Sequence, residues 1–345
     1  MKALLLILAL LTSAAASASG KIHSRYFNGV FSGDLSWMAD FEASTAAESE
    51  LKQKFVARFV DAAQPTAMAE LDDDFVRAAA GLHLHYWRTA LQQPARLDQA
   101  EASLIDDISA LLTQHQIALT DDPMEAMGSA IEARGYSFRG GRTAPLLDFM
   151  LWRKTESRTF EVKLSDGPQQ VLVHFMSDFV FRGWSSFATF GMTGTGGWAD
   201  PDALYCMADH YDRQSEDFLN SYLRHEGRHF ADYALYPKLQ GADLEYRGKL
   251  TELIYASEPR TLIDKFARAA NFQTTAPHPL ANAHVVDRLA RKLDGNGAGT
   301  ASAVLADASG EQISAAAAAL LDAHSAELNG LGADGTSGVI APIID

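Results

Sequence analysis

Residues 215–237 of the chain read SEDFLNSYLRHEGRHFADYALYP. The residues that recur there every three or four positions are Phe218, Tyr222, His225, His229 and Asp232. This spacing is typical of one face of a helix, and Pro237 ends the pattern because proline cannot continue a helix. We therefore expect a helix in which one face carries several titratable side chains.

Short segments rich in β-branched and aromatic residues precede this helix, at residues 147–152, 159–164, 171–176 and 179–184. Turn residues separate them, most clearly Asp166-Gly167-Pro168. This pattern predicts a small, mostly antiparallel sheet. Residues 204–209 (LYCMAD) are expected to add a strand just before the helix.

Helical periodicity dominates the rest of the chain. Residues 45–134 contain three apolar stripes, the first opened by a capping box, Thr45 with Glu48. Asp121 or Asp122 with Pro123 opens a fourth, shorter helix that ends near Gly135. Further helices are expected over 244–256, from Pro259 onward, and over 311–328. The predicted fold class is α+β, with a signal peptide at 1–18, a mainly helical N-terminal domain at 19–140, a second domain at 141–292 that holds the sheet and the polar helix, and an Ala/Gly-rich C-terminal helix and tail at 293–345.

The N-terminus predicts export. Lys2 precedes an apolar run at residues 3–11, and the small residues that follow include Ala16-Ser17-Ala18, the form of a cleavage site. We expect residues 1–18 to be removed and the mature chain to be periplasmic or secreted. No later segment offers about 18 uninterrupted apolar residues, so no membrane span is expected in the mature form.

Charge and cysteine content limit the chemistry. The chain has 44 acidic and 29 basic residues, a net charge of −15 that disfavours nucleic-acid binding. Its one cysteine, Cys206, excludes an internal disulfide framework and any cysteine-based zinc site. A bound metal would therefore need His, Asp or Glu ligands.

The segment His225-Glu226-Gly227-Arg228-His229 has the pattern H-E-x-x-H inside the expected helix. Imidazoles four residues apart share a face and can bind one tetrahedral cation. Glu226 lies about 100° around the helix from His225, beside such a cation, where its carboxylate can accept a proton from a water molecule. The pattern indicates metal-assisted hydrolysis.

A third protein ligand must come from elsewhere. Asp232 lies too far along the helix axis to reach a cation between the two imidazoles, and we expect it in an outer or surface role. Glu245 and Glu252 lie seven residues apart on one face of the next helix, and either can return to the site.

This arrangement resembles the gluzincin-type zincin metallopeptidases, in which a Glu from a later helix completes H-E-x-x-H. In several such families that Glu begins an E-[aromatic]-x-[small]-D stretch, and residues 245–249 (EYRGK) match four of the five positions. The resemblance implies one Zn²⁺ bound by His225, His229 and Glu245, with Glu226 as general base and a peptide or protein as substrate. Lys249 departs from the pattern, since an acid that orients a ligand histidine often occupies that position.

The resemblance also implies an edge strand that aligns the substrate and a group that stabilises the oxyanion. Residues 204–209 take the place of that strand, with a plain core strand as the alternative. The candidates for the oxyanion role are Tyr246, Tyr255, His210 and Tyr211. A leucine at position 235 excludes the metzincin pattern, which requires a third histidine there.

Two other interpretations stay open. One is a catalytically inactive zincin-like scaffold that acts as a binding module outside the cytoplasm, and the other is a metal-free structural protein. The glycines of residues 191–197 (GMTGTGG) lack a phosphate-binding motif and suggest a mobile rim. His83 and His85 lack a nearby acidic partner and are interpreted as structural. The oligomeric state is not predicted.

Overall fold

A computed structural model describes residues 22–200, 202–294, 299–332 and 338–341, so the expected signal peptide lies outside the described residues. The fold is α+β, as the sequence predicts. The chain divides into two compact units. Unit 1 comprises Met1–Lys154 and Ser177–Gly194, and unit 2 comprises Thr155–Met176 and Thr195–Asp345.

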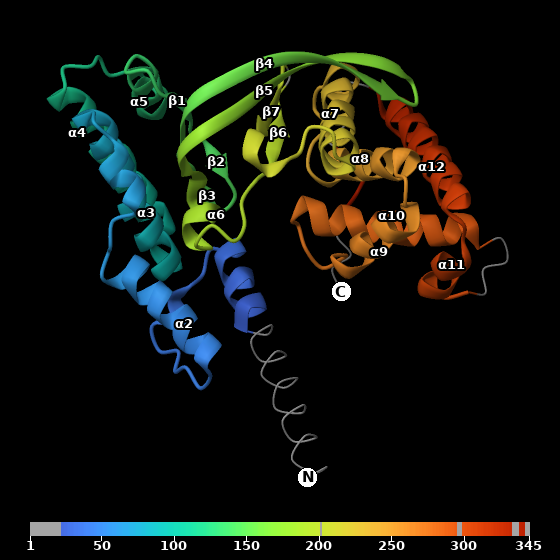
Figure 1. The fold of residues 1–345 in the computed structure, drawn as a ribbon, viewed down its shortest axis with the longest axis horizontal. Helices are drawn as coiled ribbons and strands as arrows, with labels where there is room; N and C mark the ends of the chain where they lie inside the picture. Colours follow the sequence, from blue (N-terminus) through green and yellow to red (C-terminus); the bar gives the residue numbers. More distant parts are fainter. Residues whose placement is uncertain (1–21, 201, 295–298, 333–337, 342–345) are drawn as a thin grey trace, which may run out of the picture. The chain divides into compact units, whose positions relative to one another are not determined.

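Unit 1 is mainly helical (Figure 1). Its helices include α2 (Ala46–Phe55), α3 (Asp74–Gln92), α4 (Leu97–Gln114), α5 (Pro123–Glu132) and the short α6 (Gly183–Ala188). The side chain of Thr45 accepts from the backbone of Glu48 and completes the predicted capping box. A core that includes Trp87, Phe149 and Trp184 joins these helices to the strand ends of the same unit.

The strands form a mixed sheet in the order β1-β4-β5-β7-β6. The long strands β4 (Met150–Leu164) and β5 (Gly167–Arg182) pass through both units. In unit 1, β1 (Ser137–Arg139) pairs antiparallel with β4. In unit 2, β7 (Leu204–Met207) pairs parallel with β5 and antiparallel with β6 (Gly197–Ala199). A separate two-stranded sheet joins β2 (Arg142–Thr143) to β3 (Leu146–Leu147).

The strand boundaries differ from the sequence-based expectation. Segments 147–152 and 159–164 were expected as separate strands, but β4 continues through the exposed residues 153–159 between them. Likewise, β5 contains both 171–176 and 179–184 up to Arg182. Apolar alternation marks only the parts of a strand that have a buried face, so it misses a polar connection exposed on both faces.

The expected edge strand is not at the edge. Residues 204–207 form β7, which lies between β5 and β6, and residues Ala208–His210 form a 3₁₀ turn. The short strand β6 is the outer neighbour. A Cβ on Gly197 would clash with the carbonyl oxygen of Tyr205 and with the Tyr222 ring, so close packing requires glycine there. Because glycine weakens the sequence pattern of a strand, the sequence did not predict β6. Within unit 2, this part of the Gly-rich segment is a packed strand, whereas a mobile rim was expected.

Unit 2 adds six α-helices after β7 among the residues that the structure describes. These are α7 (Leu223–Leu235), α8 (Ala242–Tyr255), α9 (Pro259–Arg268), α10 (Pro277–Leu293), α11 (Ala301–Asp307) and α12 (Gly310–Leu331). An apolar cluster that includes Leu250, Leu289 and Ile313 packs α8, α10 and α12 together (Figure 1). The capping box of Ser309 with Gln312 opens α12.

The two units differ in extent from the expected domains. Residues 141–154 and 177–194 group with the helical N-terminal part, and the segment beyond residue 292 groups with unit 2. Both α11 and α12 contribute to the apolar cluster of unit 2, through Leu305 and Leu321. None of the helices in the described part of the chain is long and apolar enough to span a bilayer.

Candidate metal centre

The site is built where α7 packs against α8, within unit 2. A π-helical turn, Asp217–Tyr222, leads into α7. The chain then reverses, and Gly241 takes a positive φ of 62° directly before α8. The two helices run antiparallel, since His225 faces Gly248 while His229, one turn later, faces Leu244.

The two imidazoles of α7 lie side by side. The ring centroids of His225 and His229 are 4.6 Å apart, and the residues are 4% and 5% exposed. The structure thus brings together the pair that the four-residue spacing places on one face, in surroundings largely closed to water.

Glu226 lies beside the second imidazole. Its Oε2 is 3.2 Å from Nδ1 of His229. One ligand atom from each of His225, Glu226 and His229 lies within 4.8 Å of the other two. Burial would raise the pKa of Glu226, but the hydrogen bond to His229 and the charges of both histidines outweigh it and lower that pKa. The carboxylate is therefore held in the form that accepts a proton.

Glu245 approaches from α8. Its Oε2 lies 3.3 Å from Nε2 of His225 and 3.8 Å from Nζ of Lys249. Despite burial, positive charge on neighbouring histidines holds the pKa of Glu245 well below its usual value. Glu245 stands outside the three-residue group above because it contacts His225 and not the whole set.

Glu252 meets the other nitrogen of the same ring. Nδ1 of His225 donates to Oε1 of Glu252 at 2.7 Å. Burial alone would lower the pKa of His225, but Glu245 and Glu252 together raise it to about 10. Glu252 therefore fixes the ring and leaves Nε2 turned toward Glu245.

A backbone carbonyl orients the second imidazole. Nε2 of His229 donates to the carbonyl oxygen of Leu244 at 2.9 Å, which leaves Nδ1 facing Glu226. Metal-binding histidines commonly donate one ring N–H to a carboxylate or carbonyl while the other nitrogen binds the ion. Both rings of α7 have this arrangement.

The spacing of His225 and Glu245 matches that of two ligands of one zinc ion. Imidazole and carboxylate ligands lie about 2.0–2.2 Å from Zn²⁺, so adjacent ligand atoms of a tetrahedral site are about 3.3–3.5 Å apart. Nε2 of His225 and Oε2 of Glu245 are 3.3 Å apart. That carboxylate oxygen is buried and makes no hydrogen bond, although Nδ1 of His278 lies 2.7 Å from it. Its contacts with basic side chains are charge pairs, and a bound cation could replace the positive charge that they supply.

Two glycines permit this close packing. A Cβ on Gly248 would lie 2.7 Å from Cε1 and Nε2 of His225. A Cβ on Gly227 would lie 3.0 Å from Cγ1 of Val162, the close neighbour that a glycine inside the helix suggests. Gly248, three residues after Glu245, thus lets α8 approach the imidazole of His225 directly.

His278 contacts the site, and sequence reasoning missed it. It lies near the start of α10, and its Nδ1 is 2.7 Å from Oε2 of Glu245. Its side chain is 67% exposed. No spacing rule links a residue in α10 to H-E-x-x-H, so no sequence signal identified it.

The structure places the oxyanion candidates in several environments. Tyr246 is buried in the apolar cluster beside His324, and Tyr255 packs against Arg224. Tyr211 packs against Tyr222, and His210 packs in turn against Tyr211. Burial is the main cause that raises the pKa of Tyr211 to about 12, and the charge of Glu226 adds to it. Tyr211 is thus the candidate whose pKa the charge of Glu226 raises.

Asp232 pairs with arginines and not with the imidazoles. It is fully buried and forms an ion pair with Arg247 of α8 and another with Arg228 of α7. This agrees with an outer role but not with a surface position.

Comparison with known proteins gives no match to a family model, to a curated protein or to a solved structure.

Proposed function

We propose that this chain is a zinc-dependent metallopeptidase that hydrolyses peptide bonds, with one Zn²⁺ bound by His225, His229 and Glu245 and with Glu226 as general base. One observation carries the proposal: donor atoms of His225, Glu226 and His229 lie within 4.8 Å of one another, and Oε2 of Glu245 lies 3.3 Å from Nε2 of His225. Carboxylates paired with imidazoles in a buried site favour cation binding over simple packing.

The chain's own residues divide the chemistry among them. Bound zinc would supply Lewis acidity to water and to the substrate carbonyl. Glu226, with its lowered pKa, accepts the proton of the attacking water and passes it to the leaving amine. Glu252 and the Leu244 carbonyl hold the two imidazoles in orientation. Tyr211 is the candidate that stabilises the oxyanion.

The proposal includes a zincin-like arrangement of unit 2, with α7 as the active-site helix and α8 as the helix that supplies the third ligand. It also includes export by the N-terminal signal, which agrees with a mature enzyme in the periplasm or outside the cell acting on peptides or proteins. The role of β6 beside β7 as a substrate-aligning edge belongs to the same proposal.

The first test replaces the general base. Glu226→Gln keeps the size of the side chain but removes the proton acceptor, so we expect zinc to be retained while cleavage of a peptide library falls about 10²- to 10⁴-fold. Glu258→Gln, an exposed change in the same unit, serves as the control and should keep full activity.

Unchanged turnover in Glu226→Gln would refute the assigned role. A wild-type protein that binds zinc but cleaves nothing in the library would instead support the alternative, a catalytically inactive binding module.

A further inference from the structure

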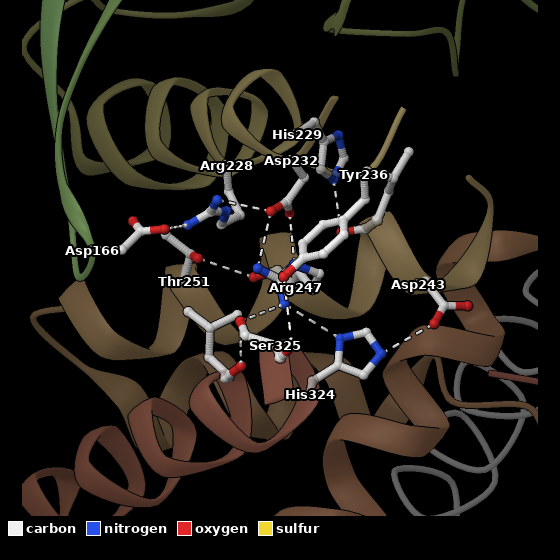
Figure 2. A network of polar contacts seen from close by, with 12 residues as sticks. Asp166, Arg228, His229, Asp232, Tyr236, Asp243, Arg247, Thr251, His324 and Ser325 are labelled. Atoms are coloured by element: carbon white, nitrogen blue, oxygen red, sulfur yellow. Dashed lines mark hydrogen bonds and ion pairs between the residues drawn. The ribbon is translucent and has the colours of Figure 1, made fainter. Parts of the chain in front are cut away.

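A buried ion pair links the two helices of the candidate centre. Nε and Nη2 of Arg247 in α8 donate to Oδ2 and Oδ1 of Asp232 in α7, at 2.8 and 2.9 Å (Figure 2). Asp232 is 0% exposed and Arg247 is 1% exposed. Neither contact uses an atom of the three proposed zinc ligands.

Further contacts tie this pair to the rest of unit 2. On one side, Nη2 of Arg228 lies 2.7 Å from Oδ1 of Asp232, and its Nη1 donates to Asp166 in the turn between β4 and β5. On the other side, Nη1 of Arg247 donates to Oγ of Ser325 in α12 (Figure 2). The pair is therefore connected through Arg228 to the turn between β4 and β5, and through Ser325 to α12.

The position of the pair bears on the metal ligands. Asp232 lies one turn after His229 on the same face of α7, and Arg247 lies two residues after Glu245 in α8. One residue of rotation turns a helix by about 100°, which would swing Glu245 away from His225. A bidentate contact between a guanidinium and a carboxylate has a fixed direction. It therefore restricts both the rotation of α8 and its sliding along α7.

Stability alone is a weak reason for this pair. Burying two charges costs desolvation, and apolar side chains of similar volume often stabilise a protein as well or better. Apolar packing, however, does not supply a contact of fixed direction that sets the rotation of one helix against another.

We propose that Asp232 and Arg247 are a positioning pair that sets the rotation and register of α8 against α7, and thereby the convergence of His225, His229 and Glu245 on one ion. This inference rests on the proposed zinc site. It assigns a function to the C-terminal segment as well, because Ser325 of α12 holds Arg247.

The test uses two variants of the full chain. Asp232→Asn removes the negative charge of the pair. Arg247→Lys keeps the positive charge but cannot make the bidentate contact. If Asp232→Asn does not fold, the milder Arg247→Lys provides the test. Leu289→Ala in the apolar cluster is the matched control, since it destabilises unit 2 without touching the pair. The readouts are the zinc Kd from chelator competition and the absorption spectrum of bound Co²⁺, at a temperature where circular dichroism shows a folded chain.

We expect the zinc Kd of the folded pair variants to rise about tenfold, with a changed Co²⁺ spectrum, while Leu289→Ala keeps the wild-type Kd and spectrum. An unchanged Kd and spectrum in folded Arg247→Lys would overturn the positioning role and leave the proposed peptidase intact. If all variants bind metal as expected but the wild type cleaves no peptide, the peptidase proposal fails and the positioning pair stands. A wild type that takes up no metal overturns both.

Discussion

Each imidazole of the candidate centre has one nitrogen committed to an acceptor and one nitrogen facing a carboxylate. For His225 the acceptor is Glu252, and for His229 it is the carbonyl of Leu244. These contacts give the two rings fixed orientations before any ion arrives. Preformed ligands lose less conformational entropy on binding, so the arrangement favours tight metal binding.

Another buried histidine gives unit 1 a pH dependence. His83 of α3 packs against Phe149, with ring centroids 4.5 Å apart, and burial lowers its pKa to about 4. The unfolded chain binds the proton near the ordinary pKa of about 6.5, so the stability that depends on neutral His83 is complete above that pH and is lost as the pH falls toward 4.

We therefore predict that acidification from pH 7 to pH 5 removes about 2 kcal/mol of unfolding free energy through His83. Urea titrations of the wild type and of His83→Leu at both pH values measure this loss, and the variant should lose about that much less than the wild type. His85→Leu, an exposed change in the same helix, should behave as the wild type does. Equal pH dependence in all three proteins would contradict the prediction.

Residue spacing predicted part of the site. The H-E-x-x-H spacing was enough to expect His225 and His229 on one face of a helix. It did not distinguish Glu245 from Glu252, because residues seven apart share a face and only the structure shows which ring nitrogen each one meets. His278 and the burial of Asp232 depend on tertiary packing, which no local pattern encodes.

At the scale of elements, the close approach of α8 to α7 depends on Gly248. An added Cβ would lie 2.7 Å from the ring of His225, and that ring cannot turn freely because Glu252 holds it. Helix packing distance is thus set by the absence of one side chain.

Gly248→Ala should therefore weaken zinc binding and lower the melting temperature of unit 2, although alanine is the better helix former. Gly330→Ala in α12 is the control, since a Cβ there meets nothing within 4 Å, and it should leave stability unchanged or raise it by about 0.5–1 kcal/mol. Calorimetry and zinc titration of both variants provide the measurement. If Gly248→Ala binds zinc as tightly as the wild type and melts no earlier, Gly248 does not set the distance between α7 and α8.

The elements themselves could be predicted to different degrees. Apolar stripes located α3 and α4, and the capping box of Ser309 with Gln312 located α12. The strands were fragmented, because residues 153–159 are exposed on both faces and carry no alternation. The position of β7 inside the sheet follows from pairing with β5 and β6, which a single segment cannot reveal.

At the scale of the whole chain, all residues of the candidate centre belong to unit 2. Sequence composition suggested a separate Ala/Gly-rich tail, yet α12 packs in the same apolar cluster as α8 and contacts Arg247. Alanine-rich helices bury small side chains without a strong apolar stripe, so composition understates their part in a core.

The central claim is that one zinc ion joins α7 to α8 through His225, His229 and Glu245. Elemental analysis of the purified mature chain, beside Glu245→Ala and Glu252→Ala, tests it most directly. We predict about one zinc per wild-type chain, little or none in Glu245→Ala, and a reduced zinc content in Glu252→Ala, whose affinity should fall about 10- to 100-fold because it loses only an orienting contact. A wild-type chain without zinc, or full zinc occupancy in Glu245→Ala, would contradict the account.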